Sequence, residues 1–388
     1  MADIVNKILY VINNLDIGGT EKHIVTLLPE LTKKGIVPIL FCIEGKGKLA
    51  EKLQASNIDI LWAPVSSFFL KIPLIGAYIS AFTSAAYLIF TIVRLRPQVI
   101  HFFMPKSYII GGTCSLIDRN LIKIMSRRCL NNYQLKHPIL RRCEKLLHKR
   151  MDLILGNSQS VCDQIMLEGV EKDKIKLIYN GINYKDYMPG PANDNIRKKL
   201  NTNGHIVILM ISNLKHYKGH EDLFHALAKI KSKMPAAWKL LLAGRDDGCK
   251  DYLKKLGDKL AINENIEFLG ERTDIPEIIR LSDIGVQPTY EEGFSNSILE
   301  MMAGGLAVIA TDVGGNGEAI VDNDCGFLVP VKTPEILAGK LFELINNADL
   351  RQRLGDNARN RVISDFSMEK CVEQYLAIYQ SCRMANVN

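Results

Sequence analysis

Short apolar runs alternate with helical patterns along the whole 388-residue chain, and this alternation is the strongest constraint on its fold. Four runs of the first half are typical of buried strands: residues 7–15, 38–43, 98–103 and 153–158. The second half contains six more: residues 205–213, 239–244, 266–270, 284–289, 307–311 and 326–330. Nearly continuous apolar strands separated by helices indicate parallel sheets that are covered on both faces. The sequence therefore predicts an α/β protein with doubly wound, Rossmann-like sheets.

The length of the chain predicts two domains. Residues 180–200 contain Asn, Gly and Pro and show little periodicity, as a linker does. We expect an N-terminal, acceptor-binding domain over residues 1–185 and a nucleotide-sugar-binding domain over residues 186–365. The helical pattern of residues 366–388 follows without a strand, and we expect it to pack back on the first domain. Ligands of open parallel sheets bind beyond the carboxyl ends of the strands, so we predict two sheets that face each other across a cleft.

The formal charge of +7 is unevenly distributed. Residues 1–190 carry about +10 and the remaining residues about −3. Between Arg119 and Arg150 there are ten basic residues and one acidic residue, Glu144. This predicts an anionic partner, such as a phosphate, an acidic glycolipid or a membrane surface, with a solvated basic face as the alternative. Nucleic acid is disfavoured because no aromatic stacking platform interleaves with these charges.

An uncharged run extends from Ile72 to Val93 and is long enough to cross a bilayer. It contains Pro73, Gly76 and several hydroxyl side chains, and it leads directly into the predicted strand 98–103. We therefore predict a buried or membrane-docking helix, with a true membrane span as the alternative.

The nine cysteines are scattered and include no C-x-x-C pair. Disulfide frameworks and zinc sites both use paired spacings, so reduced thiols are the better interpretation. The N-terminal residues run directly into a strand pattern and lack the features of a signal peptide. We expect a cytoplasmic protein, which the basic first half can hold at the inner face of a membrane.

Two glycines, Gly18 and Gly19, follow the first predicted strand, and a helix begins near Thr20 or Glu21. Close backbone approach together with a helix N-terminus suits a diphosphate. The spacing is not G-x-G-x-x-G, which disfavours a dinucleotide site. The alternative is an ordinary tight turn capped by Thr20.

A loop containing Lys215 and Lys218 follows the predicted strand 205–213, at whose end Asn213 stands. Two ammonium groups held there can neutralise charge that develops on a leaving diphosphate. Exposed loop lysines are the ordinary alternative.

Two glutamates lie eight residues apart after the predicted strand 284–289, with Glu292 in a loop and Glu300 in a helical pattern. Glu300 can accept hydrogen bonds from ribose hydroxyls. The alternative is a capping box made by Ser297 and Glu300. Backbone N–H groups that can meet sugar hydroxyls or phosphate follow the first glutamate: Gly293, Phe294 and Ser295.

These three segments together resemble family 4 glycosyltransferases, which are retaining enzymes with the GT-B fold. The resemblance rests on the pair of glutamates, the loop N-L-K-x-x-K-G-H and the loop G-G-T-E, and it continues through T-D-V-G-G-N-G-E-A-I-V and G-F-L-V. It covers essentially the whole chain. It implies transfer of a hexosyl or N-acetylhexosaminyl group from a nucleotide-sugar, most often a UDP-sugar, to a glycan or lipid-linked glycan, without a metal or other cofactor.

The resemblance also implies roles for single residues. Glu292 would contact the donor sugar, Glu300 the ribose and Lys218 the diphosphate. Lys215 would stand at or near a second basic position where many members have Arg, and Lys lacks the bidentate geometry of Arg. The implied donor-binding set is Gly18, Gly19, Asn213, Lys215, Lys218, Glu292, Gly293, Phe294, Ser295 and Glu300.

His101, at the end of the predicted strand 98–103, is placed where similar enzymes have a cleft histidine. It joins Glu292 and Lys218 as a candidate catalytic residue that touches the sugar or orients the acceptor. A satisfied core histidine is the alternative.

A D-x-D motif at Asp322–Asp324 can hold a divalent metal in other transferase folds, but its position before a strand favours a turn. Two other functions remain open: a sugar-nucleotide epimerase on the same fold and a non-catalytic nucleotide-binding homologue. The sequence identifies neither the sugar, the base, the acceptor nor the linkage.

Overall fold

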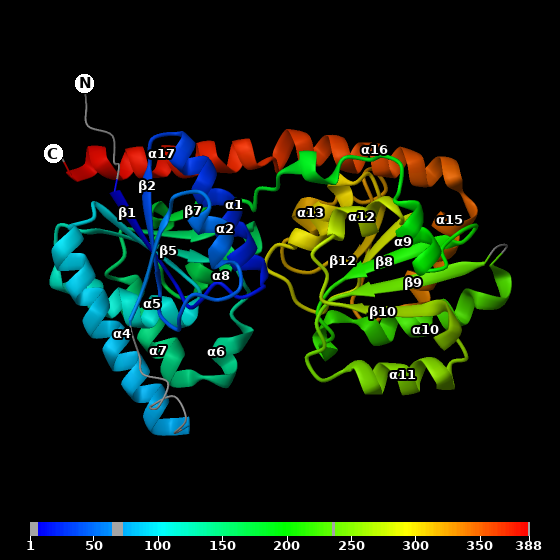
Figure 1. The fold of residues 1–388 in the computed structure, drawn as a ribbon, viewed down its shortest axis with the longest axis horizontal. Coiled ribbons are helices and arrows are strands. Elements are labelled where there is room, and N and C mark those ends of the chain that lie inside the picture. Colours follow the sequence, from blue (N-terminus) through cyan, green and yellow to red (C-terminus); the bar gives the residue numbers. More distant parts are fainter. Residues whose placement is uncertain (1–6, 64–72, 235–236, 387–388) are drawn as a thin grey trace. The chain divides into compact units, whose positions relative to one another are not determined.

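The computed structural model describes residues 7–63, 73–234 and 237–386. Ile72, the first residue of the uncharged run, lies outside the described residues. The chain forms two compact units (Figure 1). Unit 1 comprises Met1–Gly181 and Met368–Asn388, and unit 2 comprises Ile182–Ser367.

The described residues of unit 1 form a parallel sheet of seven strands in the order β3-β2-β1-β4-β5-β6-β7. The strands are β1 (Lys7–Ile12), β2 (Val37–Cys42), β3 (Asp59–Trp62), β4 (Val99–Phe103), β5 (Ile122–Arg127), β6 (Leu153–Gly156) and β7 (Ile175–Leu177). The helices are α1 (Gly19–Lys33), α2 (Ala50–Gln54), α4 (Pro73–Leu95), α5 (Pro105–Cys114), α6 (Asn132–Lys136), α7 (Pro138–His148), α8 (Gln159–Leu167) and α17 (Met368–Asn386).

Helices cover both faces of this sheet, and each face has its own core. Successive residues of β1 point to opposite faces. Tyr10 packs with residues of α1 and α17 on one face, whereas Leu9 and Val11 pack with residues of α4, α5 and α8 on the other. Because both faces are buried, β1 is apolar from Ile8 to Ile12 instead of alternating.

Helix α17 completes the core of unit 1, although all of unit 2 separates it from the rest of that unit. Its buried residues recur at intervals of three and four, so they form one face of the helix. The hydroxyl of Tyr379 lies 2.9 Å from the hydroxyl of Tyr10 and 2.9 Å from Nδ1 of His101. The buried face of α17 consists of Met368, Cys371, Val372, Tyr375, Tyr379 and Cys382.

The described residues of unit 2 form a parallel sheet of six strands in the order β10-β9-β8-β11-β12-β13. The strands are β8 (Ile206–Ile211), β9 (Trp238–Ala243), β10 (Ile266–Gly270), β11 (Ile284–Gln287), β12 (Ala307–Thr311) and β13 (Phe327–Val329). The helices are α9 (Asp194–Lys199), α10 (His220–Ile230), α11 (Lys250–Lys259), α12 (Ile275–Arg280), α13 (Asn296–Ala303), α14 (Asn316–Ala319), α15 (Pro334–Asn346) and α16 (Ala348–Asp365). The predicted fold class, two Rossmann-like parallel-sheet domains, is confirmed.

Three strands of unit 1 are absent from the sequence prediction: β3, β5 and β7. Strand β5 was hidden because it includes Lys123 and Arg127, which belong to the basic stretch. Both side chains are buried: Lys123 donates to the carbonyl oxygens of Asp118 and Leu121, and Arg127 binds two buried glutamates. The basic stretch is therefore not a single solvated face, because part of it is a central strand.

We expect Tyr379→Ala to destabilise unit 1 by about 3–5 kcal/mol, as loss of a large buried aromatic ring does. The substitution also removes the hydrogen-bond partner of Tyr10 and His101. Hydrogen exchange in increasing urea measures the effect: amides of β1 should exchange faster, and those of β8 at the wild-type rate. Gln380→Ala, at the exposed neighbouring position, is the control. Equal exchange of β1 in the two variants would contradict the role of α17.

Candidate functional site

The loops that follow β8 and β11 meet at the carboxyl edge of the unit 2 sheet, because these strands pair directly. The 3-10 turn η4 (His216–Lys218) follows β8. Gly219 then adopts φ +77°, and a Cβ built there would lie 1.8 Å from the carbonyl oxygen of Pro288. The amide of Tyr290 donates to the carbonyl oxygen of Tyr217 at 2.7 Å. Only glycine allows the two loops to approach this closely.

This contact brings together two of the predicted catalytic residues. The Nζ of Lys218 lies 2.7 Å from Oε2 of Glu292, and both side chains are mostly buried. Burial alone would lower the pKa of Lys218, but the neighbouring Glu292 carboxylate outweighs it, and the pKa is raised. Lys218 therefore keeps its positive charge at neutral pH.

The loop of Glu292 is fixed from its other side by the segment after β12. Gly314 has φ +52°, and a Cβ built there would lie 1.7 Å from the carbonyl oxygen of Glu292. The amide of Gly315 donates to the carbonyl oxygen of Gly293 at 2.9 Å. The T-D-V-G-G segment of the sequence thus serves to position the Glu292 loop.

Glu300 lies on α13 and is only 6% exposed. Its carboxylate is hydrogen-bonded to Tyr187, from the 3-10 turn η3 (Tyr184–Tyr187), and burial together with this carboxylate raises the pKa of Tyr187. The alternative interpretation, a capping box made by Ser297 and Glu300, is wrong. The N-cap is Ser295, whose hydroxyl accepts a hydrogen bond from the amide of Ile298 at 3.4 Å.

The residues between the two glutamates lie at the N-terminus of α13, where helix N–H groups begin. The ring of Phe294 is buried and packs on Phe366 with 5.3 Å between ring centroids. Phe294 therefore anchors the loop with its side chain, and only its backbone belongs to the candidate site together with Gly293 and Ser295.

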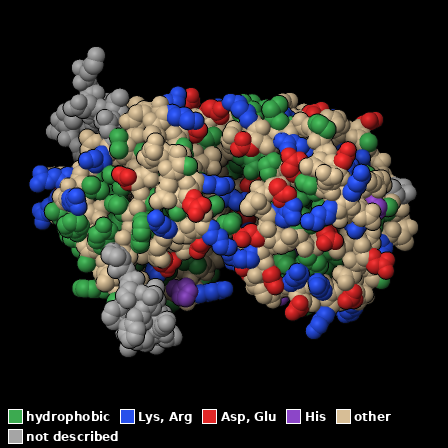
Figure 2. Space-filling model, viewed as in Figure 1, with side chains coloured by type: hydrophobic (Ala, Val, Ile, Leu, Met, Phe, Trp, Pro, Cys, Tyr) green, Lys and Arg blue, Asp and Glu red, His purple; other side chains and the backbone are tan. Residues whose placement is uncertain are grey.

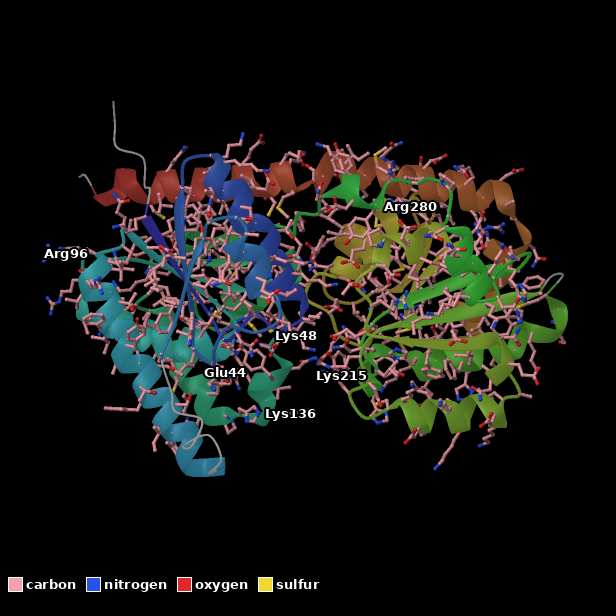
Figure 3. The ribbon with its side chains drawn as sticks, in the orientation of Figure 1. Glu44, Lys48, Arg96, Lys136, Lys215 and Arg280 are labelled. Atoms are coloured by element: carbon pink, nitrogen blue, oxygen red, sulfur yellow. The ribbon has the colours of Figure 1, made fainter. Side chains whose placement is uncertain are left out.

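Lys215 does not join the Lys218–Glu292 pair. Its Nζ lies 3.3 Å from Oδ2 of Asp247, in the loop after β9 (Figure 3). Arg245 binds the other oxygen of Asp247 at 2.7 Å and, with Lys215, holds the pKa of this carboxyl below its usual range. The backbone amide of Arg245 donates to Oδ1 of Asn213 at 3.1 Å.

Sequence analysis missed three residues of this region: Arg245, Asp247 and Tyr187. The signal for the first two was available, since R-D-D directly follows the predicted strand 239–244 and therefore stands at the same sheet edge. No sequence pattern connects Tyr187 with Glu300, because more than a hundred residues separate them.

Gly18 and Gly19 belong to unit 1, where they begin α1. Gly18 is the N-cap of α1, with extended backbone. A Cβ there would lie 2.3 Å from Oε2 of Glu21, so a larger residue would require the end of this side chain to move. Burial raises the pKa of Glu21.

His101 lies in the core of unit 1 and has no exposed surface. Its Nδ1 lies 2.9 Å from the Tyr379 hydroxyl and its Nε2 2.8 Å from the Ser126 hydroxyl. Burial, followed by the charge of Arg128, lowers the pKa of His101 to about 3, so the ring is neutral at physiological pH. Its environment is therefore that of a satisfied core histidine, which was the alternative to a catalytic role.

The D-x-D motif forms a turn between α14 and β13. Asn323 has φ +62°, and its amide donates to the carbonyl oxygen of Gly326 at 2.9 Å. Oδ1 of Asp322 accepts from the amide of Leu328 at 2.9 Å. These bonds give the motif a structural role.

Family models match both halves of the chain. A model of glycosyl transferases group 1 matches residues 192–361, and a model of glycosyltransferase family 4 matches residues 17–186. Together they leave unmatched only the two ends and residues 187–191. The chain belongs to the family 4 glycosyltransferases. The resemblance of its motifs to this family is thereby confirmed.

Individual relatives agree with this membership. N-acetyl-alpha-D-glucosaminyl L-malate synthase of Bacillus anthracis is 30% identical over 60% of this chain and 60% of its own length. D-inositol 3-phosphate glycosyltransferase of Corynebacterium glutamicum is 24% identical over 96% of this chain and 94% of its own. The chain spans 60% of the length of the first three curated relatives that it matches.

Solved structures agree with the fold. The crystal structure of Anabaena HepE in complex with UDP and glucose superimposes with a TM-score of 0.84 at 22% identity. The superposition covers 97% of this chain and 100% of that one. At this level of identity the likeness shows the fold alone, which is that of GT-B structures.

We expect Gly314→Ala to displace the Glu292 loop and to destabilise unit 2 by about 1–3 kcal/mol beyond backbone strain, because the new methyl group meets a carbonyl oxygen. Gly204→Ala is the matched control, with φ +70° and no atom within 4 Å of the added Cβ, so it isolates the strain. Thermal unfolding and hydrogen exchange of residues 290–295 measure both effects. Identical behaviour of the two variants would contradict the positioning role of Gly314.

Proposed function

We propose that this chain is a retaining glycosyltransferase that transfers a hexosyl or N-acetylhexosaminyl group from a UDP-sugar to a hydroxyl of a glycan or lipid-linked glycan. The observation that carries the proposal is the Lys218–Glu292 ion pair, which stands at the carboxyl edge of the sheet beside the N-terminus of α13. Family membership and the UDP named with the Anabaena structure support this choice of donor.

In the proposed mechanism, Lys218 stabilises the charge that develops on the departing diphosphate. The ammonium group is already ionised and is held in place by Glu292, so little reorganisation is needed when the bond breaks. A single donor that is fixed in this way contributes about 2.7–4 kcal/mol to lowering a barrier. The N–H groups at the start of α13 add a positive dipole end.

Glu292 and Glu300 then act as acceptors of hydrogen bonds. Glu292 would receive hydroxyl groups of the donor sugar while its ion pair keeps Lys218 in place for the diphosphate. The buried carboxylate of Glu300 would receive the ribose hydroxyls in exchange for Tyr187. The acceptor hydroxyl would attack from the face that the nucleotide leaves, and its proton would pass to the departing phosphate oxygen.

A screen of the purified protein tests this proposal. Each UDP-sugar is combined with different candidate acceptors, and nucleotide release is the readout. The names of two relatives mention L-malate and D-inositol 3-phosphate, so the acceptors to be tested include these small anions beside glycans and lipid-linked glycans. NMR of the product should show the anomeric configuration of the donor retained. Conversion of a UDP-sugar without any acceptor would instead identify a sugar-nucleotide epimerase.

We expect Lys218→Ala to lower turnover roughly a hundredfold, because it removes one fixed donor to the leaving group. We expect Glu300→Ala to weaken UDP binding about tenfold or more, measured by calorimetry, through loss of a charge-assisted hydrogen bond.

Lys229→Ala and Glu335→Ala are the controls for these substitutions. They break an exposed ion pair of 3.0 Å in the same unit and should leave both constants unchanged. Wild-type turnover and UDP affinity in the Lys218 and Glu300 variants would remove the site assignment.

A further inference from the structure

Helix α4 of unit 1 turns a row of large apolar side chains outward. Tyr78 and Phe82 are each 76% exposed, Phe90 is 52% exposed and Val93 60% exposed. Their spacing places them on one side of the helix, and these four residues are named the α4 face. Water is an unfavourable environment for so many adjacent apolar groups, so the α4 face is adapted to contact something else.

The opposite side of α4 belongs to the core of the unit. Leu88 and Ile92 are buried against the sheet, and the hydroxyl of Ser84 donates to the carbonyl oxygen of Ile43 at 2.7 Å. Helix α4 is apolar and long enough to cross a membrane, yet only 22% of its window Tyr78–Leu95 is buried in the protein. If α4 crossed a bilayer, these residues would lose their packing against the sheet. If α4 lies on a membrane surface, this packing is kept.

The exposed apolar surface continues beside α4. The 3-10 turn η1 (Ser115–Ile117) contacts α4 and exposes Leu116 and Ile117. Helix α5 contacts both α4 and α7, so these helices lie next to one another on one face of the sheet. Figure 2 shows hydrophobic and basic side chains together at the end of unit 1 that α4 forms.

Helices α6 and α7 add exposed basic residues to this face. Three apolar residues, Leu135, Ile139 and Leu146, are exposed among them. Lys136 stands at the end of α6, and Arg96 stands just beyond α4 (Figure 3). Residues 132–150, which include both helices and the two residues after α7, are named the α6–α7 segment, and its exposed basic side chains are Lys136, Arg141, Arg142, Lys149 and Arg150.

The acidic residue of this segment does not offset these charges at the surface. Glu144 is buried and lies 3.2 Å from Nη2 of Arg127. The exposed charge of α6 and α7 is therefore basic, and it lies beside apolar groups. A surface of this kind matches a bilayer whose anionic phosphate groups overlie its acyl chains.

We propose that α4, η1 and the α6–α7 segment together dock unit 1 on an anionic membrane surface. The α4 face enters the boundary between headgroups and acyl chains, where aromatic side chains are favoured. The basic side chains of α6 and α7 bind lipid phosphates. This inference is independent of the proposed transfer reaction, since it uses neither Lys218 nor either site glutamate.

Other occupants fit these observations less well. A second copy of the chain would bring basic α6–α7 segments close together in a two-fold interface, which is repulsive. Nucleic acid would satisfy the basic side chains but would leave the α4 face against water.

Vesicle sedimentation tests the proposal directly. The wild-type protein should bind vesicles of phosphatidylglycerol and phosphatidylcholine at low salt, bind pure phosphatidylcholine at least about tenfold more weakly, and be released by high salt. Phe82→Ser with Phe90→Ser should weaken binding about tenfold or more. The control is Ile336→Ser with Phe342→Ser on α15 of unit 2, which exchanges exposed apolar residues of another unit and should bind as wild type.

A second pair of variants tests the charged part. Arg142→Glu with Lys149→Glu should weaken binding about tenfold or more, whereas Lys254→Glu with Lys255→Glu on α11 makes the same change of net charge and should have little effect. In a Phe82→Trp variant, brominated lipids should quench the fluorescence of the introduced tryptophan if the α4 face enters the bilayer.

Three results would overturn the proposal. One is equal binding of the α4 variant and its α15 control. Another is retention on vesicles after high-salt and carbonate washing, which would indicate a spanning helix. The third is a change of oligomeric mass in the α4 variant without a change in vesicle binding, which would assign the face to a second copy. Circular dichroism of each variant establishes that it is folded, since all substituted side chains are exposed.

Discussion

Every strand of a parallel sheet ends at the same edge, and the candidate site of unit 2 depends on this constraint. It places the loops after β8, β9, β11 and β12 beside one another, although they are far apart in sequence. Contacts that only glycine permits then lock the loops together, at Gly219 against Pro288 and at Gly314 against Glu292. The Lys218–Glu292 ion pair is the consequence, because neither side chain needs to move to meet the other.

The fold was predictable because both sheets are covered on both faces, which makes most of their strands nearly continuous apolar runs. All six strands of unit 2 were predicted, whereas β3, β5 and β7 of unit 1 were not, and β5 is the most instructive of them. A central strand that carries Lys123 and Arg127 looks like a surface segment until its partners are known. Those partners, Glu144 and Glu168, lie on other elements, so no local pattern could reveal that the charge of Arg127 is neutralised.

The sequence predicted several residues of the candidate site, but it did not predict which of them contact one another. Lys218 and Glu292 were found from their positions after strands, but their pairing depends on the tertiary contact of two loops. Ser297 had the correct spacing for a capping box with Glu300, yet the helix begins two residues earlier than that motif requires. His101 shows the converse, since it was predicted near a strand end but is the middle residue of β4, and its side chain lies in the core.

Helix α17 has a consequence for synthesis on the ribosome. The sheet of unit 1 is translated first, but the helix that covers Tyr10 and His101 emerges only after the whole of Ile182–Ser367. Until then one face of the sheet lacks part of its apolar cover, while unit 2 already has every element that it needs. The unit translated first is therefore the one that finishes folding last, and its uncovered face is a natural substrate for chaperones during elongation.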